Sequence, residues 1–335
     1  MVRVRIPAPP PLRRHVKLRF LPIVLAGILL AACSDTDDRA SKQAKPELPA
    51  GAQALSLLGD TLYSPELSPE VREIYEANLA QATADYEADP DDADAIIWYG
   101  RRTAYLGDYL RAITIYSEGI EKHRDDARMY RHRGHRYITT RQLDAAIADL
   151  EKAAEMIAGT EDQVEPDGLP NARNIPTSTL QSNIWYHLGL AYYLKGDFEN
   201  ALRAYRECME VSGNPDMLVA TTHWLYMTLR RLGQEKQAAA VLEPIHPEMD
   251  IIENSGYHKL LLMYKGELTP EELLAEADAG DGVANATTGY GIGNWYAYTG
   301  NPKQAEQILR NVLIGPQWAA FGYIAAEADM RRLER

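Results

Sequence analysis

Small and apolar residues recur along most of the chain in a pattern that repeats about every 34 residues. Residues 107–113 (Gly-Asp-Tyr-Leu-Arg-Ala-Ile) align with residues 196–202 (Gly-Asp-Phe-Glu-Asn-Ala-Leu). In both segments another glycine stands seven residues earlier, and a tyrosine follows the alanine after four residues. A single pair of helices cannot bury its own apolar face, so this repetition predicts helical hairpins that stack on one another. Three strong units lie near 93–126, 127–160 and 182–215, and two weaker ones near 219–252 and 286–319.

This pattern resembles the tetratricopeptide repeat family over about residues 68–335. In that family, small residues at three places of each unit let two antiparallel helices approach closely, and large aromatic side chains fill the gap to the next hairpin. The resemblance implies an all-α fold, a right-handed α-solenoid of antiparallel helical hairpins over residues 67–335. Helix is expected to begin near Ser68, which suits an N-cap and is followed by Pro69.

Two segments depart from the repeat. The insert at residues 161–181 is rich in turn-forming residues and separates the second and third strong units. Its acidic first half either folds over a neighbouring cationic helix, as a lid or pseudo-ligand, or belongs to a mobile surface loop. Residues 244–285 hold an irregular hairpin, and residues 317–335 are expected to form a last helix that caps the array.

The start of the chain has the order of an export signal. Residues 1–19 carry six basic and no acidic residues, and an apolar stretch follows that is shorter than the roughly 20 residues that span a bilayer. The stretch ends in Leu30-Ala31-Ala32-Cys33, which resembles the lipobox of bacterial lipoproteins. The resemblance implies a lipoprotein signal peptide over 1–32 and a lipidated Cys33; an ordinary cleaved signal and an uncleaved anchor are the alternatives.

Polar and acidic residues then predict a flexible tether over residues 33–66. Ser34 stands where some bacteria place the Asp that retains lipoproteins in the inner membrane, so the expected location is the outer membrane of a cell envelope, facing the periplasm.

The charge of the chain and the motifs it contains limit the classes of function that are expected. Removing the six basic residues of 1–32 from the 35 in the chain leaves 29 against 48 acidic residues, a formal net charge of −19. A body so acidic is not expected to bind nucleic acid. No catalytic signature and no cofactor motif is present, and the pair His132 and His135 has no further donors nearby to complete a metal site. Cys208 is expected to be a small core residue.

The exception in this acidic body is a cationic helix at residues 128–137, which carries four arginines and two histidines. The family resemblance implies that the first helix of each unit lines a concave groove, and its residues, transferred place by place, give a basic and aromatic surface. The expected groove residues are Arg101, Tyr105, Arg128, Arg131, His135, Asn183, Tyr186, His223, Arg230, Tyr290 and Asn294.

Arginine grips carboxylates through two parallel hydrogen bonds, so this groove predicts binding of a partner protein or peptide with acidic or carboxylate groups. The alternative for the arginines is internal pairing with acids such as Asp94, Glu161, Asp162 or Glu165. The function expected from the sequence is a lipid-anchored scaffold or adaptor at a cell envelope. A solenoid that binds a small ligand or glycan is the alternative, and an enzyme is not expected.

Overall fold

The computed structural model describes residues 48–278 and 282–333. By its internal contacts the chain divides into residues 1–46 and residues 47–335, and all described residues belong to the second unit. The predicted signal peptide, Cys33 and the first part of the predicted tether therefore lie outside the described residues.

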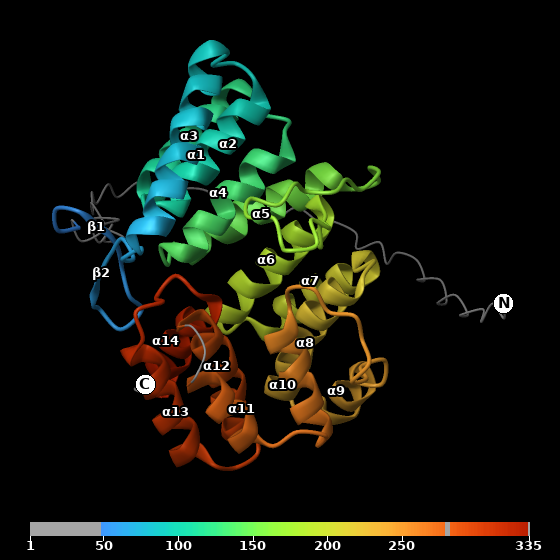
Figure 1. The fold of residues 1–335 in the computed structure, drawn as a ribbon. Helices are drawn as coiled ribbons and strands as arrows, with labels where there is room; N and C mark the ends of the chain where they lie inside the picture. Colours follow the sequence, from blue (N-terminus) through green and yellow to red (C-terminus); the bar gives the residue numbers. More distant parts are fainter. Residues whose placement is uncertain (1–47, 279–281, 334–335) are drawn as a thin grey trace, which may run out of the picture. The chain divides into compact units, whose positions relative to one another are not determined.

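The described part is almost entirely helical, and consecutive helices pack as antiparallel hairpins (Figure 1). The predicted all-α array of helical hairpins is confirmed. The helices are α1 (Pro69–Ala88), α2 (Ala93–Tyr105), α3 (Tyr109–Lys122), α4 (Ala127–Thr139), α5 (Leu143–Ile157), α6 (Leu180–Lys195), α7 (Phe198–Val211), α8 (Pro215–Arg231), α9 (Glu235–Val241), α10 (Ser255–Lys265), α11 (Pro270–Asp278), α12 (Gly282–Tyr298), α13 (Pro302–Ile314) and α14 (Phe321–Leu333).

The glycines of the repeat mark the closest contacts between paired helices. In four hairpins, a glycine of the first helix faces a large side chain sixteen residues later on the second helix. A Cβ atom at any of these glycines would come within 2.5–2.9 Å of that side chain, so a larger residue would push the helices apart. The pairs are Gly100 and Tyr116, Gly134 and Leu150, Gly189 and Tyr205, and Gly293 and Leu309.

The Gly-Asp pair between helices supplies both helix caps. Gly196 ends α6 in the left-handed conformation at φ 83°, which costs glycine no steric strain. Asp197 then caps α7, because its side chain accepts a hydrogen bond from the Asn200 backbone N–H. Asp108 caps α3 in the same way through Arg111 N. The repeated dipeptide thus sets where α3 and α7 begin.

The later helices fold back against the earlier ones. α12 contacts α8, α10 and α14, and α14 contacts α6 and α13. Buried side chains from α4 to α14 form one continuous apolar core. The array is therefore not an open stack in which each hairpin touches only its neighbours.

A β-hairpin replaces part of the predicted tether. β1 (Ala52–Leu55) pairs antiparallel with β2 (Thr61–Tyr63), and Ala52, Ala54 and Leu62 are buried. Leu57 N donates to Glu327 of α14 over 3.0 Å, and Trp318 Nε1 donates to Tyr63 O over 2.7 Å. The flexible tether predicted over 33–66 is therefore wrong for residues 48–66. The short apolar runs around Gly59 contain too few residues to stand out from the acidic segment before them.

Among the helices that the structure describes, none combines the length and the apolar character needed to cross a bilayer.

Candidate functional site

The structure places the eleven expected groove residues in two environments. Arg101, Tyr105, Arg128, His135 and Arg230 are half-buried. The other six are buried and cannot line an open surface, which corrects the sequence-based assignment. These six are Arg131, Asn183, Tyr186, His223, Tyr290 and Asn294.

Three of the six, His223, Tyr290 and Asn294, lie inside because the later helices fold back on the earlier ones. Tyr290 and Asn294 of α12 both donate hydrogen bonds to Tyr193 OH of α6. His223 of α8 stacks between the rings of Tyr257 and Tyr264. An open array would leave such side chains on a concave face, but here α10 covers His223, and α12 packs with Tyr290 and Asn294 against Tyr193 of α6.

Phe321, the first residue of α14, packs against aromatic side chains of α4 and α6. Phe321 lies 5.4 Å from His135, 5.6 Å from His187 and 6.3 Å from Tyr186, measured between ring centroids. Burial lowers the pKa of His135 and of His187 well below the ordinary value, and nearby arginines add to the effect. Both rings are therefore neutral at pH 7, and His135 does not contribute a positive charge to a groove.

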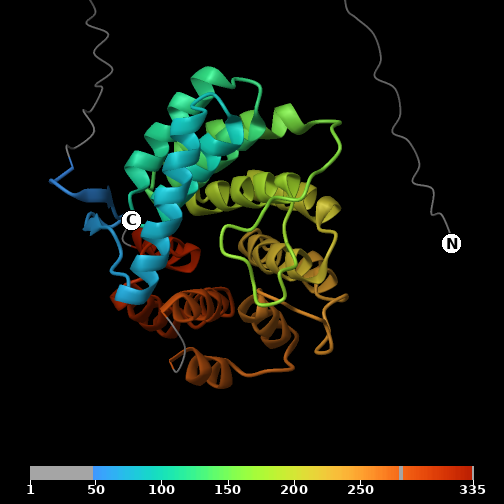
Figure 2. The same cartoon turned by 45° about the horizontal axis from the view of Figure 1, so that its top comes forward.

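The remaining cationic side chains form a site on α2 and α4. The insert 161–181 lies over this site. We call this insert the strap. It is the irregular yellow-green segment between α5 and α6 in Figure 2. Its ends meet in an isolated antiparallel bridge between Val164 and Thr179. The acidic first half of the strap thus lies on the cationic helix α4. Of the two interpretations of the insert, this agrees with the one in which it folds over that helix.

Arg131 is the most buried member of the cationic site. Its Nη2 lies 3.0 Å from Glu165 Oε1 of the strap, and the two residues are only 7% and 9% exposed. Burial lowers the pKa of Arg131, while the Glu165 carboxylate opposes that shift. Arg131 Nη1 also donates to His132 Nδ1 over 3.0 Å. Burial and the positive charge of Arg131 lower the pKa of His132 well below its usual value, so this ring is neutral.

Arg101 and Arg102 hold the main chain of the strap. Arg101 Nη1 donates to Pro166 O over 2.8 Å, and Arg102 Nη1 donates to Gly168 O over 2.7 Å. Both guanidinium groups lie over the Trp98 ring, at 4.5 and 4.9 Å from its centroid, which fixes their positions. Sequence reasoning missed Trp98 and Arg102. The spacing of Trp98 from Arg101 and from Arg102, three and four residues along one helix, was the available signal.

Gly168 lets the strap approach α2 closely. A Cβ atom at this position would lie 1.6 Å from Tyr105 OH and 2.8 Å from Arg101 Nη2. Only glycine fits here without displacing those side chains.

The second half of the strap is tied to the linker between α9 and α10. Asn171 and Thr177 donate to the two carboxylate oxygens of Glu253, over 2.8 and 2.7 Å. Arg173 forms a bidentate ion pair with Asp250. The strap therefore connects α2 and α4 with a segment some 80 residues further along the chain.

Two other arginines of the cationic helix, Arg128 and Arg133, pair with acids of the repeats. Arg128 binds Asp94 and Asp126, and Arg133 forms two 2.7 Å hydrogen bonds with Asp149. These contacts correspond to the internal pairing that was the alternative to a ligand groove.

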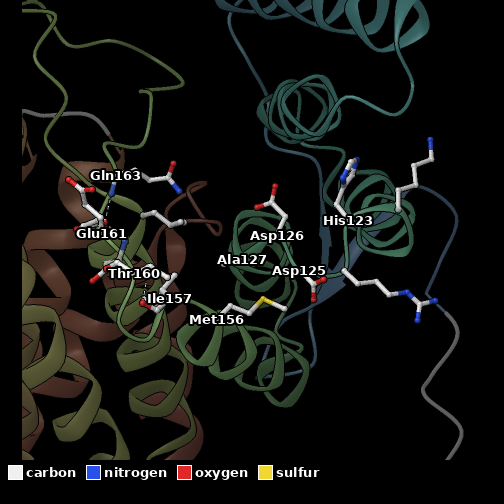
Figure 3. Close-up of a pocket in the computed structure, with 14 residues that line it drawn as sticks. His123, Asp125, Asp126, Ala127, Met156, Ile157, Thr160, Glu161 and Gln163 are labelled. Carbon is white, nitrogen blue, oxygen red and sulfur yellow. Dashed lines mark hydrogen bonds between the residues drawn. The ribbon is translucent and has the colours of Figure 1, made fainter.

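Two hollows flank the first half of the strap. One, of about 250 Å³, is lined by α2, α4 and the strap, including Trp98, Arg101 and Glu165. The other, of about 580 Å³, lies between the α3–α4 turn and the start of the strap (Figure 3). Its rim is charged on both sides, with Asp125 and Asp126 facing Glu161 across an apolar floor that includes Ile157.

No cluster of three or more ligating side chains suited to a metal ion occurs within residues 48–278 and 282–333. The thiol of Cys208, the free cysteine among these residues, is buried against Thr221 and Ser182 O.

Family models identify the repeats directly. Two models, each described as tetratricopeptide repeat, match residues 127–159 and 182–215. No curated protein matches the sequence.

Several solved structures are similar at low identity. One is YrrB, described as a TPR protein with an unusual peptide-binding site (18% identity, 74% of this chain, 97% of that chain, TM-score 0.38). Another is MamA (14% identity, 60% of this chain, 89% of that chain, TM-score 0.40). A third is a putative kinesin light chain from Podosopora anserina with nearly identical TPR-like repeats (15% identity, 67% of this chain, 95% of that chain, TM-score 0.40). None of these values supports the transfer of a binding specificity. The two matched segments carry the small residues and aromatics described above, and the similarity to tetratricopeptide repeats shown by the family models extends over residues 127–159 and 182–215.

Proposed function

We propose that this chain is a lipid-anchored scaffold of a cell envelope that binds an extended, acidic segment of a partner protein at the cationic site of α2 and α4. The site consists of Trp98, Arg101, Arg102 and Arg131. The anchor is the lipidated Cys33, which lies outside the described residues, and the proposed location is the periplasmic face of the outer membrane.

One observation carries the proposal. The cationic site already holds a carboxylate and two main-chain carbonyl oxygens of an irregular segment, all through arginine. Charge-assisted hydrogen bonds of this kind are about twice as strong as neutral ones. The same donors suit the carboxylate and carbonyl groups of an extended segment from another protein, which is a common mode of peptide recognition.

Binding of a glycan has less support. Of the three tyrosines expected in the groove, Tyr186 and Tyr290 are buried and offer no stacking surface, and Tyr105 is half-buried beneath the strap.

Capture of partners from detergent-solubilised membranes tests the proposal. A variant with Arg101→Glu and Arg102→Glu should lose a stoichiometric protein partner, because the reversed charges repel its carboxylates. The matched control is Arg203→Glu with Arg206→Glu on α7, which changes the net charge by the same amount far from the site. Equal capture by the two variants would contradict the proposed site.

A further inference from the structure

We infer that residues 164–168 of the strap are an internal copy of the partner segment and compete with it for the cationic site. This inference rests on the proposed function and gives the partner a chemical description. The partner presents a glutamate whose carboxylate pairs with Arg131, then two main-chain carbonyls that accept from Arg101 and Arg102.

The contacts have a fixed order along the strap. Glu165 supplies the carboxylate, Pro166 the first carbonyl and Gly168 the second. The residue at the first carbonyl can be proline because no N–H is used there. At the second carbonyl a Cβ atom would lie 1.6 Å from Tyr105 OH, so glycine is the residue that fits there without a shift of that side chain. A partner segment that fits is therefore an extended Glu-Pro-x-Gly or a close variant of it.

The hold of the site on the strap is incomplete. Glu165 Oε2 and Arg131 Nε are buried without a hydrogen-bond partner. The buried ion pair itself gives little net stability, because desolvation of both charges offsets their attraction. In addition, Val164, Leu169 and Ile175 are 61%, 49% and 44% exposed, so these apolar side chains of the strap bury little surface.

Exchange of the strap for a partner would conserve the strong contacts. A partner carboxylate replaces that of Glu165 on Arg131, and its carbonyls replace those of Pro166 and Gly168, so the number of ionic hydrogen bonds does not change. The hollow of about 250 Å³ beside the strap gives an incoming segment room next to Arg101 and Trp98.

The far end of the strap stays attached during such an exchange. Its contacts with Asp250 and Glu253 lie outside the cationic site, so the released half remains close to the arginines. A tethered competitor of this kind acts at a high effective concentration, of the order of millimolar for a short linker. The intact chain should therefore bind a free copy of the segment weakly.

The test uses a fluorescent synthetic peptide with the sequence of residues 161–170 and the full-length chain in detergent. Gly168→Ala should weaken the hold on the strap, because the added Cβ would lie 1.6 Å from Tyr105 OH and 2.8 Å from Arg101 Nη2, so that the strap or these side chains must shift. The matched control is Gly213→Ala, where a Cβ atom would meet nothing within 4 Å. We expect Gly168→Ala to bind the peptide roughly tenfold or more tightly than the wild type, because a competing state is destabilised. Gly213→Ala should bind it like the wild type.

A peptide in which Glu165 is replaced by Gln should bind less tightly to all proteins, since it lacks the charge that faces Arg131. If circular dichroism shows that Gly168→Ala is unfolded, Glu165→Gln in the chain takes its place with the same expected gain.

Two results would overturn the inference. Equal affinity of wild type and Gly168→Ala would mean that the strap does not compete, and the cationic site would still be a binding site. Absence of peptide binding to every variant would show that the strap does not imitate the ligand. The proposed function would then be judged by the separate capture experiment with Arg101→Glu and Arg102→Glu.

Discussion

Arg131 and Glu165 form a buried ion pair at 3.0 Å that joins helix α4 to the strap. The two residues lie 34 positions apart, on a repeat helix and on a segment that interrupts the repeats. This pair makes the strap a part of the folded body, and its removal has measurable consequences.

Glu165→Ala should release the first half of the strap and expose it to protease. Breaking a buried pair costs about 3–5 kcal/mol when the remaining charge stays buried. Release of the strap lets water reach Arg131, so we expect a smaller loss in the free energy of unfolding and faster cleavage by thermolysin before Val164, in the half of the strap that is released. Glu161→Ala is the control, because Glu161 is an exposed acid of the same segment. Equal cleavage rates of the two variants would speak against a strap held by Glu165.

Asp216→Ala should destabilise the fold. This buried carboxylate, in the first turn of α8, accepts hydrogen bonds from the backbone N–H groups of Ile252, Glu253 and Asn254. Hydrogen bonds to charged groups contribute about 1.5–3 kcal/mol each, so we expect a loss of about 3 kcal/mol or more in urea unfolding. Asp144→Ala, at an exposed carboxylate, should change stability by about 0.5 kcal/mol at most. A similar small change for Asp216→Ala would refute the proposed role of its carboxylate.

Ala201→Leu should weaken the hairpin of α6 and α7. Ala201 is fully buried at the small-residue place of its unit. Extra methylene groups in a packed contact cost about 1–3 kcal/mol, which a shift in the urea midpoint would report. Glu199→Leu, exposed on the same helix, serves as the comparison. The assigned repeat positions would be in doubt if both variants unfolded at the same midpoint.

Stability should fall in mild acid because buried histidines are neutral. Burial lowers the pKa of His223 to about 3, against about 6.5 in the unfolded chain. The unfolded state therefore binds a proton first as the pH falls, so this contribution is complete above about pH 6.5 and is lost toward pH 3. His132, His135 and His187 act in the same direction.

His223→Phe retains an aromatic ring between Tyr257 and Tyr264 but cannot titrate. Between pH 6 and 4, its free energy of unfolding should depend less steeply on pH than that of the wild type, by about 1.4 kcal/mol per pH unit for one proton. His246→Phe, at an exposed position, provides the comparison. Identical slopes for wild type and His223→Phe would rule out a titrating role for this ring.

Cys33→Ser should leave the exported body in the soluble fraction or keep the chain as an unprocessed precursor. The reason is the proposed anchor, since the sequence Leu30-Ala31-Ala32-Cys33 resembles a lipobox and that resemblance implies a lipid on this cysteine. Fractionation of membranes with immunoblotting measures the outcome. Processed protein that stays on membranes at the wild-type level would mean that another feature is the anchor.

The sequence predicts the repeats because local contacts determine them. Gly189 and Tyr205, for example, meet within one hairpin, at a spacing that a repeat search can find. The packing of α12 and α14 onto α6 and α8 joins segments far apart in the sequence and has no periodic signal. For that reason the groove assignment failed at Tyr290 and Asn294, although Arg101 and Arg131 do lie together beneath the strap. Sequence reasoning also treats Arg131 and His135 as solvated residues. Because Arg131 is buried and His135 packs against His187 and Phe321, charge reversal at these two positions would disturb the fold itself.

The contacts of Glu327 affect how cooperatively the folded body unfolds. This carboxylate on α14 binds Arg141 at the α4–α5 turn and accepts from Leu57 N in the segment before α1. In open repeat arrays each unit unfolds almost independently, and the outer units lose amide protection from hydrogen exchange first. Here the last helix, the middle of the array and the β-hairpin meet at one buried side chain. Amides of α14 and of β1 should therefore exchange at rates close to those of the central helices, with one unfolding transition for the joined elements.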